Sequence, residues 1–179
     1  MTLDGFCDHT AIIPDEQLHE HYAELLSNAG VILYGRITFQ LMEYWKTIVT
    51  NPTGKEAIDE FAVVMDKIPK IVFSTTLKDT GWESAQLASQ DIKEEATALK
   101  QQTGNPILVG SRSLIIQLLQ LGLIDEFQLC IHPVIAGKGL PLFENMNDRA
   151  TFQLLQTKIF NSGAAVFYYK PLINNHHGG

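Results

Sequence analysis

NPILVGSRSLIIQLL, residues 105–119, predicts a buried strand, a tight turn and a helix in direct succession. The helix begins near Arg112, and such a corner directs the N–H groups of its first turn at one point, where an anion is stabilised. Gly110 would let a phosphate approach the backbone, while Ser111 and Ser113 add hydroxyls and Arg112 adds charge. The same pattern also fits an ordinary strand-to-helix turn, so both interpretations stay open.

Length and composition indicate one soluble domain. The chain has 179 residues, of which 45% are hydrophobic and 18% charged, with a net charge of -7. An acidic chain without a basic run argues against a nucleic-acid partner. No apolar run is long enough to span a membrane, and nothing at the N-terminus resembles a signal peptide. Cys7 and Cys130 are far apart and form no CxxC motif, which fits a reducing cytoplasm, with a single disulfide as the open alternative.

A second corner of the same kind follows the apolar run 31–34. Here Gly35 and Arg36 turn into a helix with Thr38 in its first turn. Two corners, each with an arginine and a hydroxyl, indicate a ligand with more than one phosphate. A third strand, residues 70–73, ends in hydroxyl side chains that include Ser74 and Thr75. Ligand contacts often lie at the carboxyl ends of strands, although a solvated strand end explains these hydroxyls equally well.

Other candidate residues carry weaker signals. His19 and Glu20 lie on or near the polar side of a helix that ends at Gly30, and the His19-x-His21 spacing does not suit two metal ligands on one helical face. Trp45 could form the wall of a pocket. Asp4 could lie beside a ligand or simply bond to the backbone of its own turn.

Strands and helices alternate along the chain and are followed by a β-hairpin, residues 152–170. This order predicts an α/β fold in which a central, mostly parallel mixed sheet has helices on both faces and the hairpin adds an antiparallel edge. We expect a single domain over residues 1–172 and a frayed tail over residues 173–179, which carries His176 and His177.

Six motifs occur in an order typical of one family: LDGF (3–6), LYGRITF (33–39), KIVFSTTL (70–77), VGSRSL (109–114), GLIDE (122–126) and PVIAGKGLPLF (133–143). In these motifs the chain resembles the dihydrofolate-reductase-like family, in the branch related to the C-terminal reductase domain of the bifunctional riboflavin-biosynthesis deaminase/reductase. The resemblance implies a three-layer fold, NADPH as cofactor and a homodimer.

The resemblance also implies site residues. Cofactor contacts would come from Gly35, Arg36, Thr38, Ser74, Thr75, Gly110, Ser111, Arg112, Ser113 and Leu114. The Asp4 turn and the segment 133–139, with Pro133 and Gly137, would lie near the nicotinamide and substrate. An ungapped match puts His19, with Glu20 beside it, where dihydrofolate reductases have the carboxylate that binds the pterin.

Three departures from the family pattern qualify these expectations. Relatives usually have an apolar strand before the Leu-Asp-Gly turn, so either the chain is trimmed or its sheet has one strand fewer. Relatives often carry arginine where Thr75 stands, and Lys78 could substitute for it. Riboflavin-pathway reductases have a glutamate where Val109 stands, which counts against their phosphoribosyl-aminopyrimidine substrate and leaves a non-catalytic nucleotide-binding domain as the alternative. A Rossmann dehydrogenase is disfavoured because no G-x-G-x-x-G follows the first strand.

Overall fold

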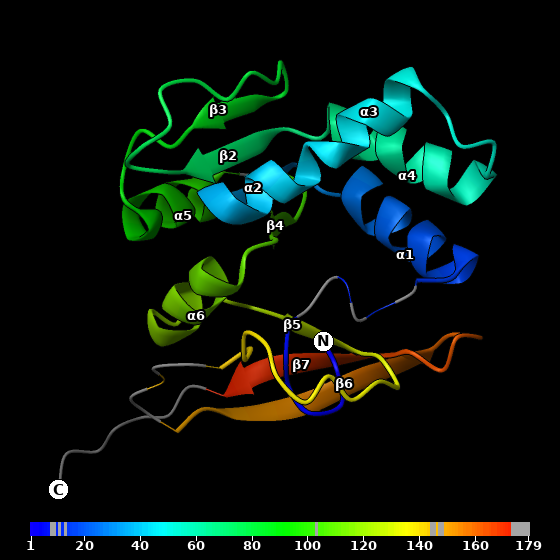
Figure 1. Ribbon diagram of the computed structural model, residues 1–179. Coiled ribbons are helices and arrows are strands. Elements are labelled where there is room, and N and C mark those ends of the chain that lie inside the picture. The colour runs from blue at the N-terminus through cyan, green and yellow to red at the C-terminus, as the bar shows by residue number, and fades with distance from the viewer. Residues whose placement is uncertain are drawn as a thin grey trace, which may run out of the picture. The chain divides into compact units, whose positions relative to one another are not determined.

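The computed structural model of the protein describes residues 1–7, 10, 12, 14–102, 104–143, 146 and 149–172. The chain forms two compact units. Figure 1 colours the chain by residue number, from blue at the N-terminus to red at the C-terminus. The parallel-sheet unit is Glu16–Leu118, and the hairpin unit combines Met1–Asp15 with Leu119–Gly179. The tail predicted over residues 173–179, including His176 and His177, lies outside the described residues. The single domain expected over residues 1–172 stays a prediction.

Strands and helices alternate in the parallel-sheet unit, as the sequence predicted. Its elements are α1 (Glu16–Ser27), β1 (Val31–Gly35), α2 (Arg36–Met42), α3 (Tyr44–Thr50), α4 (Glu56–Lys67), β2 (Lys70–Phe73), β3 (Ala85–Leu87), α5 (Ile92–Gln101), β4 (Ile107–Val109) and most of α6 (Arg112–Gln120). The strand order is β3-β2-β1-β4, and every pair is parallel. Strand β1 is a central strand with a hydrogen-bonded neighbour on each side, and its apolar run is buried.

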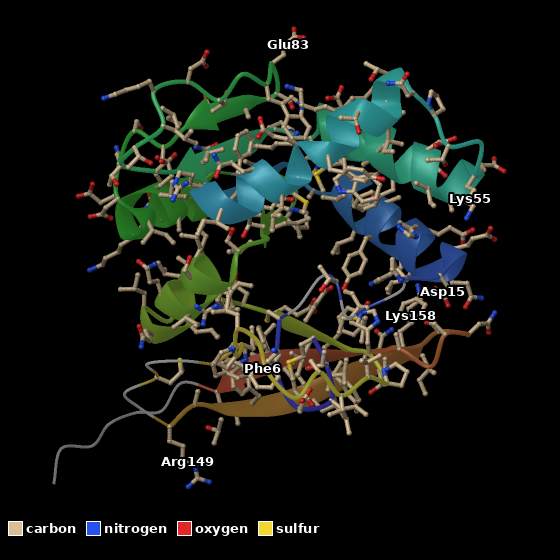
Figure 2. All side chains as sticks on the ribbon, in the orientation of Figure 1. Phe6, Asp15, Lys55, Glu83, Arg149 and Lys158 are labelled. Atoms are coloured by element: carbon tan, nitrogen blue, oxygen red, sulfur yellow. The ribbon has the colours of Figure 1, made fainter. Side chains whose placement is uncertain are left out.

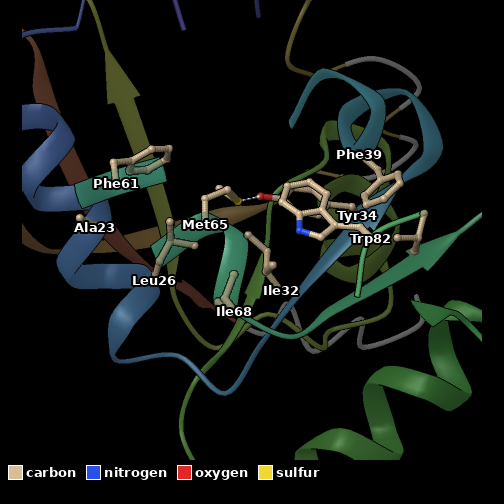
Figure 3. Close-up of a cluster of buried hydrophobic side chains, with 10 residues drawn as sticks. Ala23, Leu26, Ile32, Tyr34, Phe39, Phe61, Met65, Ile68 and Trp82 are labelled. Carbon is tan, nitrogen blue, oxygen red and sulfur yellow. Dashed lines mark hydrogen bonds between the residues drawn. The ribbon is translucent and has the colours of Figure 1, made fainter. Parts of the chain in front are cut away.

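An aromatic cluster forms the core of this unit (Figure 3). Tyr34 and Phe39 extend from the β1–α2 corner toward Trp82, and the Tyr34 hydroxyl donates a hydrogen bond to the Met65 sulfur over 3.6 Å. Burial of these rings contributes on the order of 2 kcal/mol for each large side chain. Since β1 and α2 both supply rings to the cluster, the core fixes the position of the first corner.

Antiparallel strands form the hairpin unit, with β5 (Phe127–Ile131), β6 (Thr151–Ile159) and β7 (Ala165–Leu172) in the order β5-β7-β6. The β6–β7 hairpin was predicted, and its turn contains Gly163 at φ +81°. The sequence analysis attached the hairpin to the parallel sheet as an edge. Instead, in the described part of the chain, it pairs with β5 in a separate sheet. The alternating pattern of β5, with Phe127 and Leu129 on one face, suits such an antiparallel sheet.

The N-terminal segment is part of the hairpin unit. The Leu3 N–H donates to the Val134 carbonyl over 2.8 Å, and Phe6 forms an isolated antiparallel bridge with Pro141. The Phe6 side chain, labelled in Figure 2, packs against Gly139, where an added Cβ would lie 3.2 Å from the Phe6 Cβ. The Leu-Asp-Gly turn and the segment 133–143 therefore form one joined structure. None of the helices described is long and apolar enough to cross a membrane.

Candidate functional site

Three neighbouring parallel strands, β2, β1 and β4, end at the same edge of their sheet. In the register, Gly35 pairs with Phe73 on one side, and Leu33 pairs with Val109 on the other. The residues that follow each strand therefore lie side by side at this edge. The two corners predicted to share a ligand are brought together here, which is the arrangement that the sequence analysis required.

A hydrogen bond connects the two corners directly. The Gly35 N–H donates to the Ser111 hydroxyl oxygen over 2.8 Å, and the Gly110 N–H donates to the Leu33 carbonyl over 3.0 Å. Ser111 is only 2% exposed. Its hydroxyl thus braces the bend between β1 and α2 from the bend between β4 and α6. Both glycine amides are engaged within the protein.

Gly110 is required by packing. A Cβ at this position would lie 2.3 Å from Cε1 of Tyr34 and 3.0 Å from its Cδ1, far inside van der Waals contact. The sequence analysis attributed the missing side chain to the approach of a phosphate, but the Tyr34 ring occupies that space. The Tyr34 side chain is buried, and burial raises the pKa of its phenol.

The charged and hydroxyl side chains of the corners lie farther out. Arg36 is exposed and donates from Nη1 to Oε1 of Gln40 over 3.2 Å, while Arg112 is half-buried. Ser113 is exposed, and a Cβ on Gly35 would lie 3.7 Å from the hydroxyl oxygens of both Ser113 and Ser111. Two further candidates on these helices are less accessible, since Thr38 is half-buried and Leu114 is 5% exposed.

The end of β2 is a capped turn. The Ser74 hydroxyl oxygen accepts hydrogen bonds from the N–H groups of Thr76 and Leu77, at 3.2 and 3.0 Å. Such bonds to neighbouring backbone are typical of an ordinary solvated strand end, which was the alternative to a ligand contact for these hydroxyls. Thr75 and Lys78 are exposed on the same loop. Their role toward a ligand stays a prediction.

His19 lies against two aromatic rings in the parallel-sheet unit. Its ring centroid is 6.1 Å from Trp45 and 5.9 Å from Phe61, and both ring pairs meet edge to face. Trp45 and Phe61 contact each other at 4.5 Å between centroids. His19 is half-buried, while Glu20 is exposed. The structure therefore brings together two predicted site residues, His19 and Trp45.

Asp4 belongs to the hairpin unit, where its carboxylate holds the segment 133–139. It accepts hydrogen bonds from the Thr2 hydroxyl at 2.6 Å, the Gly137 N–H at 2.7 Å and the Ala136 N–H at 3.2 Å. The hydrogen bond from Thr2, followed by those from Gly137 and Ala136, lowers the pKa of the Asp4 carboxyl. Asp4 thus fixes a turn, and Gly137 adopts φ +75° within it. Pro133 is exposed at the start of this segment.

The sequence analysis missed two residues that shape the site. Tyr34 fills the space at Gly110, and Phe61 supports His19. Tyr34 lies in the apolar run 31–34 and Phe61 is an apolar position of α4, and no local pattern identifies which side chain a buried ring will touch. Among the described residues, no group of three or more histidine, cysteine, aspartate or glutamate side chains could hold a metal ion.

The amino-acid sequence matches one protein family and is similar to a bacterial protein over most of its length. The family model of the RibD C-terminal domain matches residues 1–167. The uncharacterized protein YyaP of Bacillus subtilis (strain 168) is 33% identical over 177 residues, covering 94% of this chain and 90% of that protein.

Solved structures share the fold at low sequence identity. A candidate riboflavin biosynthesis protein from Shewanella sp. PV-4 is similar with a TM-score of 0.72 and 17% identity, covering 97% of this chain and 96% of that chain. Acinetobacter baumannii RibD is similar with a TM-score of 0.63 and 15% identity, and the match covers 96% of this chain but 56% of that one. These likenesses confirm the predicted fold class. The match to the family model shows that this chain belongs to the RibD C-terminal domain family.

Proposed function

We propose that the protein is an NADPH-dependent reductase that transfers a hydride to a small heterocyclic or carbonyl substrate. The observation that carries the proposal is the alignment of β2, β1 and β4, which gathers Arg36 and Arg112 at one sheet edge in a chain of this family. Ligands of open α/β sheets bind outside the carboxyl ends of the strands.

The donors at this edge suit a dinucleotide. Guanidinium groups bind phosphate through paired, charge-assisted hydrogen bonds, and the hydroxyls of Thr38, Ser113 and Thr75 would add neutral ones. Because Gly35 and Ser111 already bond to each other, we assign Ser111 to bracing the corners and the phosphate contacts to side chains farther out. Lys78, exposed beyond Thr75, would supply charge for a 2′-phosphate.

The cofactor supplies the hydride when bound, and the protein supplies position and proton transfer. We propose His19 as the proton donor, since an imidazole can release a proton near neutral pH and its ring is fixed by Trp45 and Phe61. Glu20, exposed beside it, is the alternative donor. Edge-to-face contacts with these two rings would limit the orientations of the imidazole, which a directed proton transfer requires.

The predicted substrate contacts stay proposals, with Trp45 in the parallel-sheet unit and Asp4, Pro133 and Gly137 in the hairpin unit. Two hydrogen bonds, from the N–H groups of Ala136 and Gly137 to the Asp4 carboxylate, fix the turn around Gly137, so this segment offers a preformed surface. We also propose a cytoplasmic homodimer, since many relatives of the branch that the sequence resembles are homodimers. Analytical ultracentrifugation would test the dimer, and a monomer at micromolar concentration would contradict it.

A non-catalytic nucleotide-binding domain is the second candidate. It is favoured by Val109, an apolar residue of β4 at the place where riboflavin-pathway reductases carry a glutamate. In this reading NADPH or another nucleotide binds at the same edge, but no substrate is reduced.

Nicotinamide fluorescence tests binding. We expect NADPH to bind the wild type, and Arg36→Gln and Arg112→Gln each to weaken binding by about 10- to 100-fold, because a hydrogen bond to a charged group contributes about 1.5–3 kcal/mol. Lys67→Gln is the matched control. This exposed lysine ends α4 just before β2 begins, at the opposite edge of the sheet, so its variant should bind normally. Equal losses in all three variants would contradict the assigned edge.

Turnover separates the two candidates. NADPH oxidation would be followed with pterins, aminopyrimidines and carbonyl compounds, in wild type, His19→Ala and Glu20→Ala. A reductase oxidises NADPH with at least one of these substrates. Binding without any oxidation supports the non-catalytic domain, and unchanged turnover in both variants assigns the proton to another source, such as water.

A further inference from the structure

A cysteine and a buried histidine lie in contact in the hairpin unit, outside the site described above. Cys130 is on β5, and His132 follows two residues later, so the two side chains leave the chain on the same side. The Cys130 sulfur is 3.5 Å from Nε2 of His132. This distance permits a hydrogen bond between the thiol and the imidazole.

The histidine is held firmly and the thiol is less enclosed. His132 is 4% exposed, and its backbone N–H donates to the Met1 carbonyl over 2.8 Å. Cys130 is half-buried, and its backbone pairs with Val166 on β7. A fixed imidazole beside a partly exposed thiol is the geometry in which a base can take the thiol proton.

Burial, more than the surrounding charges, favours the neutral form of the imidazole. Burial lowers the pKa of His132, the Met1 amino group lowers it further, and the Asp15 carboxylate acts in the opposite direction. Within the described part of the chain, the charged groups that act on His132 are the Met1 amino group and the Asp15 carboxylate, and the Cys130 thiol is the titratable group in contact with it; Asp15 is labelled in Figure 2. A neutral ring can accept a proton, and Asp15 then offsets part of the positive charge that results.

We propose that Cys130 is a reactive thiol whose proton passes to His132 as the sulfur attacks an electrophilic carbon or a hydroperoxide. With an alkyl halide, an S–C bond forms, the halide leaves and the proton moves to Nε2. With a hydroperoxide, an S–O bond forms as the O–O bond breaks. The sulfur is oxidised by two electrons to a sulfenic acid, and the leaving oxygen takes the proton to give water or an alcohol.

Cys7 provides an internal reference, because it is half-buried like Cys130 in the same unit. The full-length protein would be treated with a small excess of iodoacetamide, and each cysteine followed by peptide mass spectrometry. At pH 7 an ordinary thiol, with a pKa of about 8.5, is only about 3% thiolate, so an effective base can accelerate reaction by on the order of 10-fold. We expect Cys130 to be labelled about 10-fold faster than Cys7.

His132→Asn removes the base. We expect it to slow labelling of Cys130 to the rate of Cys7 without changing Cys7, with circular dichroism confirming the fold. If this variant unfolds, the wild-type pH profile decides: the Cys130 rate should level off below the ordinary thiol pKa, and a profile like that of Cys7 overturns the proposal. Hydrogen peroxide followed by dimedone should mark Cys130 first, and equal marking of both cysteines also overturns it.

Discussion

The close packing of Gly110 on Tyr34 predicts opposite outcomes for alanine at the two glycine corners. At Gly110 a Cβ would lie 2.3, 3.0 and 3.2 Å from three atoms of one ring, where carbon atoms normally sit about 3.5–4.0 Å apart. The Tyr34 ring is 2% exposed and has little room to move. Overpacking of a core typically costs about 1–3 kcal/mol, and this contact belongs at the upper end.

Gly35→Ala is the matched control, because this glycine already has a conformation open to any residue, with φ -80° and ψ 158°. Its Cβ would lie 3.7 Å from the nearest atom, an ordinary contact. Loss of backbone freedom in the unfolded chain should make this variant equal to the wild type or more stable by about 0.4–1 kcal/mol.

Thermal and urea unfolding would measure the difference. For a chain of this size about 3 kcal/mol corresponds to a fall in Tm of roughly 6–12 °C for Gly110→Ala. Replacing Tyr34 with leucine removes the atoms that clash, so in the Tyr34→Leu background the cost of Gly110→Ala should shrink by more than about 1 kcal/mol. The packing argument is wrong if Gly110→Ala has the same Tm as Gly35→Ala. It is also wrong if the effects of Tyr34→Leu and Gly110→Ala on the free energy of unfolding are additive.

Three further predictions concern single side chains. Ser111→Ala should destabilise the protein by about 1–3 kcal/mol, because the Gly35 N–H loses its acceptor, and hydrogen exchange should show the Gly35 amide opening faster. Burial lowers the pKa of the Lys70 ammonium from 10.5 to about 8. Between these two pH values the unfolded chain binds more protons than the folded one, so the free energy of unfolding should rise with pH. Lys70→Met should lose this rise. The pKa of the Asp4 carboxyl is lowered in the folded state. The ionised carboxyl therefore stabilises the fold above the unfolded pKa of about 4, and this stabilisation is lost as pH falls through the folded pKa. In acid titration followed by circular dichroism, Asp4→Asn should lose less stability than the wild type.

The fold could be predicted from the sequence because its signals are local. The apolar run 31–34 matched the pattern of a central strand, and glycine with arginine after each of two such runs marked the strand-to-helix corners. The assignment of β5 was harder. Its alternating pattern indicated a strand with two different faces, but pairing with β7 rather than with the parallel sheet depends on contacts across 34 or more residues.

For the candidate site, the sequence indicated where the bends lie in the chain but not which residues their side chains contact. Gly110 and Ser111 were correctly placed at a bend, but their neighbours Tyr34 and Gly35 lie about 76 residues earlier in the chain. Asp4 illustrates the same limit: its turn was expected, whereas its bonds to Ala136 and Gly137 required the structure. A hydroxyl or a glycine at a turn has several uses, and only the three-dimensional neighbours decide among them.

The bracing between the corners changes what a ligand at this sheet edge could use. The N–H groups of Gly35 and Gly110 both donate within the protein, to the Ser111 hydroxyl and the Leu33 carbonyl. A diphosphate therefore cannot be held by these two amides in the way that glycine-rich phosphate loops hold theirs. Its charge would have to be met by side chains farther out, such as those of Arg36 and Arg112. Tyr34 and Ser111 already hold the two corners within the protein, so the specificity for the proposed ligand would rest on the side chains around them.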